Sequence, residues 1–172
     1  MNTFSTSLHT RIHQLFDERA AQAPDHPFLF MPDRVMTLGQ LAVQVDALEA
    51  ELREAGVRLG DRVLVAAENC PEHVALVLAC SRVGAWACGV NARMTASELA
   101  GFAAKADARV LYFTVGVSPA ARQHAQQYDT RASVLPALQR TLADPQATAQ
   151  TGDLAERVAA IIFTSGTTGQ PK

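Results

Sequence analysis

The stretch that decides the fold is Ile161-Ile162-Phe163-Thr164-Ser165-Gly166-Thr167-Thr168-Gly169-Gln170-Pro171-Lys172. The four consecutive apolar residues from Ala160 to Phe163, which lead into this stretch, are typical of a strand covered on both faces. The two glycines free the backbone to approach a ligand closely. The hydroxyl groups offer hydrogen-bond donors to an anion, and Lys172 adds a compact positive charge. This combination indicates a loop that binds the phosphates of a nucleotide, placed where a buried strand ends.

The bulk composition fits one globular domain. The chain has 172 residues, of which 48% are hydrophobic and 19% charged, enough for a substantial core. The formal net charge is −2, and the absence of a basic stripe argues against nucleic acid as a partner. The most apolar run, Val74 to Val90, is interrupted by Ser81 and Arg82, so we expect no membrane span. Three cysteines without CxxC spacing favour a reducing, cytoplasmic setting: Cys70, Cys80 and Cys88.

Short apolar runs alternate with helical patterns after residue 60, and this alternation is typical of βαβ units. Thr37 with Gln40, and Thr95 with Glu98, form capping boxes that open two of the helices. The pattern therefore predicts an α/β fold with a mostly parallel sheet and helices on both faces. We expect helices over 7–21, 37–55, 71–83, 95–105 and 118–128, a hairpin over 28–36, strands over 63–67, 85–90, 110–113, 133–135 and 158–163, and a weak helix and linker over 136–152.

Other kinds of site fit the sequence less well. The common P-loop requires four residues between its glycines, but Gly166 and Gly169 have two between them. Phe163 stands where a hydrolase nucleophile elbow requires glycine, so Ser165 is not expected to be a nucleophile. His9 and His13 are spaced to share a helix face, but no third ligand follows them, so we expect a solvated face and no metal site. Trp86 is expected in the core, and the cysteines are expected to be ordinary core or helix residues.

The string from Thr164 to Lys172 closely resembles the phosphate-loop signature of the adenylate-forming, or AMP-binding, superfamily. Two earlier stretches also resemble motifs of that family and occur in the same order. Thr37 to Leu41 is similar to its first core motif, and Arg82 to Asn91 is similar to its second. The chain departs from the family where prolines are common, because Gly89 and Ala92 stand there. This departure affects the expected shape of one loop.

The resemblance implies a two-step ligase that uses ATP with Mg²⁺ and transfers an acyl group to coenzyme A. ATP and a small-molecule carboxylic acid would form an acyl-adenylate, and a thiol would then take the acyl group. It assigns no catalytic or metal-binding residue to this chain, since the family's catalytic lysine belongs to a C-terminal domain that has no counterpart here. The residues that the resemblance assigns to the β- and γ-phosphates are Thr164, Ser165, Gly166, Thr167, Thr168, Gly169 and Lys172.

The resemblance also predicts how much of the enzyme these residues supply. Residues 1–172 correspond to the N-terminal part of the AMP-binding domain and stop within the phosphate-binding loop, so we expect the fragment alone to be inactive. Asn91 and the turn that follows it favour the acyl-CoA synthetase branch, with fatty acids as the expected substrates. The alternatives are an aryl-CoA ligase, a peptide-synthetase adenylation domain, a non-catalytic nucleotide-binding module, or a structural fragment that self-associates through surface exposed by truncation.

Overall fold

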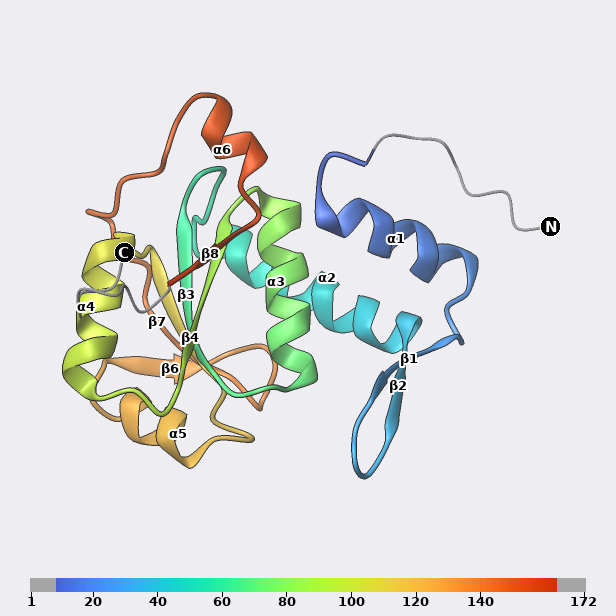
Figure 1. Cartoon of the computed structure of the whole chain (residues 1–172), viewed down its shortest axis with the longest axis horizontal. Coiled ribbons are helices and arrows are strands. Elements are labelled where there is room, and N and C mark those ends of the chain that lie inside the picture. Colours follow the sequence, from blue (N-terminus) through green and yellow to red (C-terminus); the bar gives the residue numbers. More distant parts are fainter. Residues whose placement is uncertain (1–8, 164–172) are drawn as a thin grey trace.

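In the computed structural model, residues 9–163 are described, and they form an α/β fold around one six-stranded mixed sheet (Figure 1). A small antiparallel hairpin lies to one side, formed by β1 (Pro27–Phe30) and β2 (Val35–Thr37). The strands of the main sheet are β3 (Arg62–Ala67), β4 (Trp86–Asn91), β5 (Val110–Phe113), β6 (Thr130–Ala132), β7 (Gln139–Thr141) and β8 (Ala160–Ile162). Their order across the sheet is β6-β7-β5-β3-β4-β8.

The four strands β5, β3, β4 and β8 run parallel, which confirms the predicted mostly parallel sheet. All residues of β3 are buried, because helices cover both faces of the sheet and leave no solvated side. Val63 and Val65 pack into the hydrophobic cluster on one face, whereas Leu64 and Ala66 pack into the cluster on the other. This alternation is the period of two that a strand requires.

The helices divide between the two faces. The first face is covered by α2 (Leu38–Glu54) and α3 (Pro71–Val83), with α1 (Ile12–Gln22) packed outside them. The opposite face is covered by α4 (Ala96–Ala106) and α5 (Pro119–Ala125), and the short α6 (Asp153–Arg157) precedes β8. None of the helices within residues 9–163 is long and apolar enough to cross a membrane.

Local signals set the ends of these helices as predicted. The Thr37 hydroxyl accepts a hydrogen bond from the Gln40 N–H at 3.3 Å, and the Gln40 side chain accepts one from the Thr37 N–H at 3.0 Å. Thr95 and Glu98 form the same reciprocal cap on α4. Gly84 ends α3 at φ 80°, a left-handed conformation that favours glycine.

Helix α1 differs from its prediction. It was predicted over 7–21 and spans Ile12–Gln22, and the predicted start at residue 7 lies outside the described residues. Within this helix Phe16 is buried, whereas Leu15 is 57% exposed. The physical reason is that α1 packs on the outside of α2 and α3 and buries only a narrow stripe, while an ion pair from Arg82 to Asp17 at 2.6 Å holds its other side.

The predicted strand over 133–135 was also wrong, because this segment is the turn between β6 and β7. Hydrogen bonds to Glu51 of α2, a buried carboxylate, hold this turn away from the sheet. Its oxygens accept hydrogen bonds from the Ser133 hydroxyl at 2.8 Å, the Val134 N–H at 2.6 Å and the Tyr112 hydroxyl at 2.7 Å. The buried guanidinium of Arg140 lies 3.2 Å from the same carboxylate.

The segment over 136–152 was predicted as a weak helix and linker, but it contains β7 and a loop held by two buried arginines. Arg62 donates to the Thr148 carbonyl at 2.6 Å, and Arg109 donates to the Ala147 carbonyl at 2.6 Å. The Gln150 N–H donates to the Gly60 carbonyl at 3.0 Å. These hydrogen bonds join the loop to groups at the amino ends of the strands. Distant residues therefore fix the conformation of the loop, and its own hydrophobic pattern does not reveal it.

We expect Glu51→Ala to lower the free energy of unfolding by about 3–5 kcal/mol, because it leaves the Arg140 guanidinium buried without its counter-charge. Urea denaturation followed by circular dichroism measures this change. The matched control is Glu54→Ala, a substitution at the exposed end of the same helix, which should change stability by less than about 0.5 kcal/mol. A Glu51→Ala protein as stable as the control would show that the cluster contributes little.

Candidate functional site

The carboxyl ends of the parallel strands share one edge of the sheet, and ligands of open α/β sheets bind at this edge. Strand β8 ends there at Ile162, two positions before the first residue of the predicted phosphate loop. The loop residues themselves lie outside the described residues: Thr164, Ser165, Gly166, Thr167, Thr168, Gly169 and Lys172. Their assignment to a phosphate site therefore stays a prediction.

The strand that leads into this loop is placed by its neighbour β4. Gly89 pairs with Ile162 in parallel register, and the Ala87 N–H donates to the Ala159 carbonyl at 3.2 Å. After β8, the Phe163 ring packs against Phe102 of α4 with ring centroids 4.6 Å apart. The chain therefore reaches the phosphate motif directly beside the end of β4.

A topological switch point lies between β3 and β4. The chain leaves β3 for α3 on one face and leaves β4 for α4 on the other, so the two connections diverge and open a crevice between them. The structure shows a hollow of about 670 Å³ at this crevice. Its lining comes from Ala67, Glu68, Asn69, His73, Gly89, Val90, Asn91, Arg93 and Val117.

The two charged groups of the hollow, Glu68 and Arg93, pair with each other. Arg93 Nε lies 3.3 Å from one Glu68 carboxylate oxygen and Nη2 lies 3.4 Å from the other. The Ser118 hydroxyl donates to the same carboxylate at 3.1 Å. Hydrogen bonds from Arg93 and then from Ser118 lower the pKa of Glu68, so the carboxylate is charged at neutral pH and balances the arginine.

His73 is the only imidazole that lines this hollow among the described residues. It lies in the first turn of α3, and its partial burial lowers its pKa, so the ring is neutral at pH 7. No group within residues 9–163 hydrogen-bonds the ring. Gly89 lies across from it: a Cβ at that position would lie 3.5 Å from His73 Nε2, so the glycine leaves the space beside the imidazole open.

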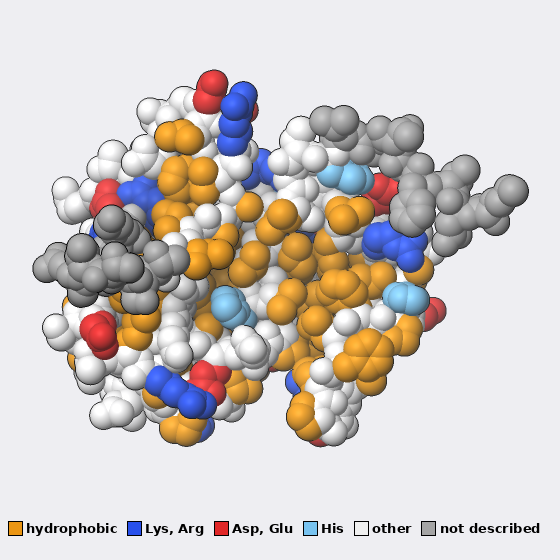
Figure 2. All heavy atoms as spheres, in the orientation of Figure 1, with side chains coloured by type: hydrophobic (Ala, Val, Ile, Leu, Met, Phe, Trp, Pro, Cys, Tyr) orange, Lys and Arg blue, Asp and Glu red, His pale blue; other side chains and the backbone are white. Residues whose placement is uncertain are grey.

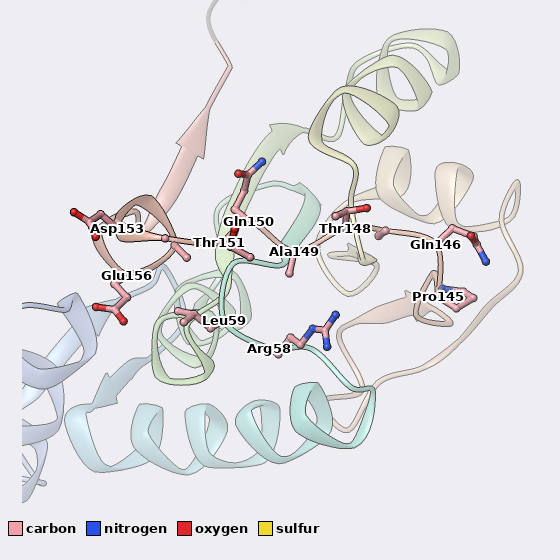
Figure 3. Close-up of a pocket in the computed structure, with 13 residues that line it drawn as sticks. Arg58, Leu59, Pro145, Gln146, Thr148, Ala149, Gln150, Thr151, Asp153 and Glu156 are labelled. Carbon is pink, nitrogen blue, oxygen red and sulfur yellow. The ribbon is translucent and has the colours of Figure 1, made fainter.

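A larger hollow, of about 820 Å³, lies at the opposite edge (Figure 3). Asp153 and Glu156 of α6 line one end of it, and Pro145 and Gln146 line the other (Figure 3). It opens at the amino ends of the strands, where α/β sheets seldom bind ligands. The described residues that line it include no histidine, cysteine or lysine, the side chains that most often act as bases or nucleophiles near neutral pH, so we assign it no function.

The two histidines and Trp86, which were considered in the sequence as possible site residues, each contact other groups of the fold. His9 Nε2 lies 2.9 Å from a Glu18 carboxylate oxygen, and His13 Nδ1 lies 2.9 Å from the Ser81 hydroxyl. No group of three metal-ligating side chains occurs in the part of the chain that the structure describes. Trp86 is buried, as predicted, and its indole N–H donates to the Ala155 carbonyl at 3.2 Å.

The hollow between β3 and β4 was not predicted from the sequence. A signal was present, because polar residues directly follow both buried runs: Glu68 and Asn69 after β3, and Asn91 at the end of β4. The missing information was that β3 and β4 are neighbours. Only that pairing brings the two polar segments to one place.

Comparison with known proteins identifies the family. Residues 16–172 match the family model described as AMP-binding enzyme. The chain is 34% identical over 163 residues to pyochelin synthetase PchE of Pseudomonas aeruginosa, a match that covers 94% of this chain and 10% of that protein. It is 30% identical over 168 residues to the medium/long-chain-fatty-acid–[acyl-carrier-protein] ligase FadD10 of Mycobacterium tuberculosis, covering 90% of this chain and 30% of that ligase.

Solved structures agree with the fold. The Klebsiella oxytoca NpsA N-terminal subdomain, in complex with 3-hydroxyanthranilyl-AMSN, is 28% identical and superposes with a TM-score of 0.65, covering 94% of this chain and 39% of that one. The N-terminal domain of FACL13 from Mycobacterium tuberculosis, at 22% identity and a TM-score of 0.70 over 94% of this chain and 43% of that one, shares the fold.

The chain thus spans a tenth of one curated relative and three tenths of another. The family match nevertheless extends over nearly all of the chain and includes the phosphate motif. The order of the motifs and the parallel sheet that carries them agree with that match. The chain belongs to the AMP-binding enzyme family, the adenylate-forming superfamily that its motifs resemble.

Proposed function

We propose that this chain is the N-terminal part of the AMP-binding domain of an AMP-forming acid–thiol ligase, and that the loop from Thr164 to Lys172 holds the β- and γ-phosphates of MgATP. One observation carries the proposal: the phosphate motif follows a parallel strand at the carboxyl edge of the sheet. In α/β folds that edge is where ligands bind.

The chemistry explains why such a loop is needed. In the first step a carboxylate oxygen attacks the α-phosphorus of ATP, and pyrophosphate leaves. Two anions must approach each other, so the site has to neutralise the triphosphate and align the attack. The hydroxyls and backbone N–H groups of the loop, with Lys172, would bind the departing pyrophosphate. In the second step a thiol sulfur attacks the acyl carbon and AMP leaves.

Within this family we propose the acyl-CoA synthetase branch, with a fatty acid as substrate and coenzyme A as acceptor. The similarity to a medium/long-chain-fatty-acid ligase supports the substrate class. A second candidate is a peptide-synthetase adenylation domain, which the similarity to pyochelin synthetase favours. In both candidates the substrate is a small-molecule carboxylic acid and the acceptor is a thiol.

Two further expectations belong to this proposal. The cysteines Cys70, Cys80 and Cys88 are free thiols in the structure, which supports the reducing, cytoplasmic setting. Figure 2 shows an apolar band over α3, α1 and the β1–β2 hairpin. Of these elements, α1 has the exposed side chain Leu15 and the hairpin has the exposed side chain Phe30. A surface of this kind supports coverage by further protein, or self-association of these 172 residues.

We expect the 172-residue chain to bind MgATP with a dissociation constant of about 1 mM, which corresponds to about −4 kcal/mol, because it lacks the family's adenine and ribose contacts. Lys172→Ala should weaken binding roughly tenfold by removing a charged hydrogen-bond donor. A calorimetric titration at high ligand concentration measures both constants.

The control is Arg34→Ala, which removes an exposed positive charge from the turn of the β1–β2 hairpin. It should leave the affinity unchanged. An equal loss of MgATP affinity in both variants would mean that binding depends only on the net charge of the chain. Submicromolar binding by the unmodified chain would instead favour a self-sufficient nucleotide-binding module.

We also expect these 172 residues alone to show no ATP–pyrophosphate exchange with a panel of fatty and aryl acids. The reason is that no residue here matches the family's catalytic lysine or most of its acyl pocket. Exchange above a blank without protein would contradict this expectation.

A further inference from the structure

The ion pair between Glu68 and Arg93 joins the two sides of the crevice between β3 and β4. Glu68 is the first residue after β3, and Arg93 is the second residue after β4. These strands are neighbours in the sheet, and the hollow of about 670 Å³ lies between the connections that leave them. Both residues line that hollow, so the bond between their side chains spans it.

The carboxylate end of this pair is held by other groups of the fold. The Glu68 N–H donates to the Thr114 hydroxyl at 3.1 Å, and the Ser118 hydroxyl donates to the Glu68 carboxylate at 3.1 Å. Thr114 and Ser118 belong to the connection between β5 and α5. Only 29% of the Glu68 side chain is exposed. These contacts fix the carboxylate whether or not the arginine is bound to it.

The arginine end can move without its backbone. The Arg93 N–H donates to the Asn91 side-chain oxygen at 2.9 Å, and His124 Nε2 lies 2.9 Å from the Met94 carbonyl oxygen, so the turn on both sides of Arg93 is held. The side chain itself is 74% exposed, and Glu68 is its only partner within residues 9–163. Exposed side chains change rotamer within nanoseconds, so Arg93 can leave the carboxylate by rotation alone.

The geometry of the pair makes it weak. Its two N–O distances are 3.3 and 3.4 Å, longer than the roughly 2.7–2.9 Å of strong charge-assisted hydrogen bonds. Exposed ion pairs are also screened by dissolved salt. The Glu68 carboxylate is charged at neutral pH, because hydrogen bonds from Arg93 and Ser118 lower its pKa. Ionic strength therefore controls the pair near neutral pH.

We propose that the Glu68–Arg93 pair is a strap across the mouth of this hollow, closed when the side chains are paired and open when Arg93 rotates into solvent. The closed strap restricts access to His73, which lines the hollow. A molecule enters at a rate set by the fraction of time that the strap is open. The proposal assumes no particular ligand for the hollow or for the phosphate motif, so it goes beyond the proposed function and does not rest on it.

The test measures how fast diethyl pyrocarbonate modifies the neutral imidazole of His73 in the 172-residue chain at about pH 7.5. Peptide mass spectrometry gives the rate for each histidine, and the exposed His26, which does not line the hollow, serves as internal reference. Arg93→Gln should raise the His73 rate relative to His26 about twofold to fivefold, because an exposed ion pair favours the closed state only modestly. Glu68→Gln should have a similar effect.

The matched control is Arg122→Gln, which removes an exposed positive charge from α5 away from the hollow. It should leave the relative His73 rate unchanged. Raising the salt concentration from about 0.01 to 1 M shortens the screening length about tenfold. This change should raise the relative rate in the unmodified chain and have no effect in Arg93→Gln. Dispersed amide spectra establish that each variant is folded.

A relative His73 rate that is unchanged in folded Arg93→Gln would overturn the proposal, even if Glu68→Gln raised it, because the arginine is the moving end. An equal increase in Arg122→Gln would also overturn it, since the rate would then follow the net charge of the chain. A salt effect that persists in Arg93→Gln would have the same consequence. Failure of the chain to bind MgATP would contradict the proposed function alone and would leave these rates, and the strap, unaffected.

Discussion

The pairing of β4 with β3 on one side and with β8 on the other is the constraint on which the candidate site depends. Six residues of β4 pair with β3, and Ala87, Cys88 and Gly89 pair with β8. These ladders join segments that are far apart in sequence, and forming such contacts requires closure of long loops. They determine both the crevice between β3 and β4 and the place from which the phosphate motif starts.

The two edges of the sheet differ in how their polar groups are satisfied. At the amino ends, Arg62 and Arg109 donate hydrogen bonds to carbonyl groups of the 144–148 loop and so close that edge with protein groups. At the carboxyl ends, Asn69 and His73 line a hollow, and the partly buried imidazole has no partner within residues 9–163. The buried Arg109 Nε at the amino edge also lacks a partner among the described residues, so unpaired polar groups occur at both edges. The carboxyl edge is favoured because ligands of open α/β sheets bind there.

The elements that follow local rules could be predicted from the sequence. Helix α3 and strand β5 have the predicted bounds, because Pro71, Gly84 and an uninterrupted apolar run mark their ends. The turn between β6 and β7 was not predicted, since it depends on Glu51, a residue more than eighty positions earlier. The 144–152 loop was missed for the same reason, because its hydrogen-bond donors come from β3 and from Arg109.

The candidate site likewise has a part that could be predicted from the sequence and a part that could not. The phosphate motif could be recognised from consecutive residues, whereas the hollow required knowledge of which strands are neighbours.

The central claim is that the carboxyl edge, and not the larger hollow at the amino edge, binds the nucleotide. Mapping backbone amide shifts during addition of MgATP tests it most directly. We expect shifts at Glu68, Gly89 and Phe163 and none at Arg58 or Gln150; shifts centred on Arg58 and Gln150 would contradict the account.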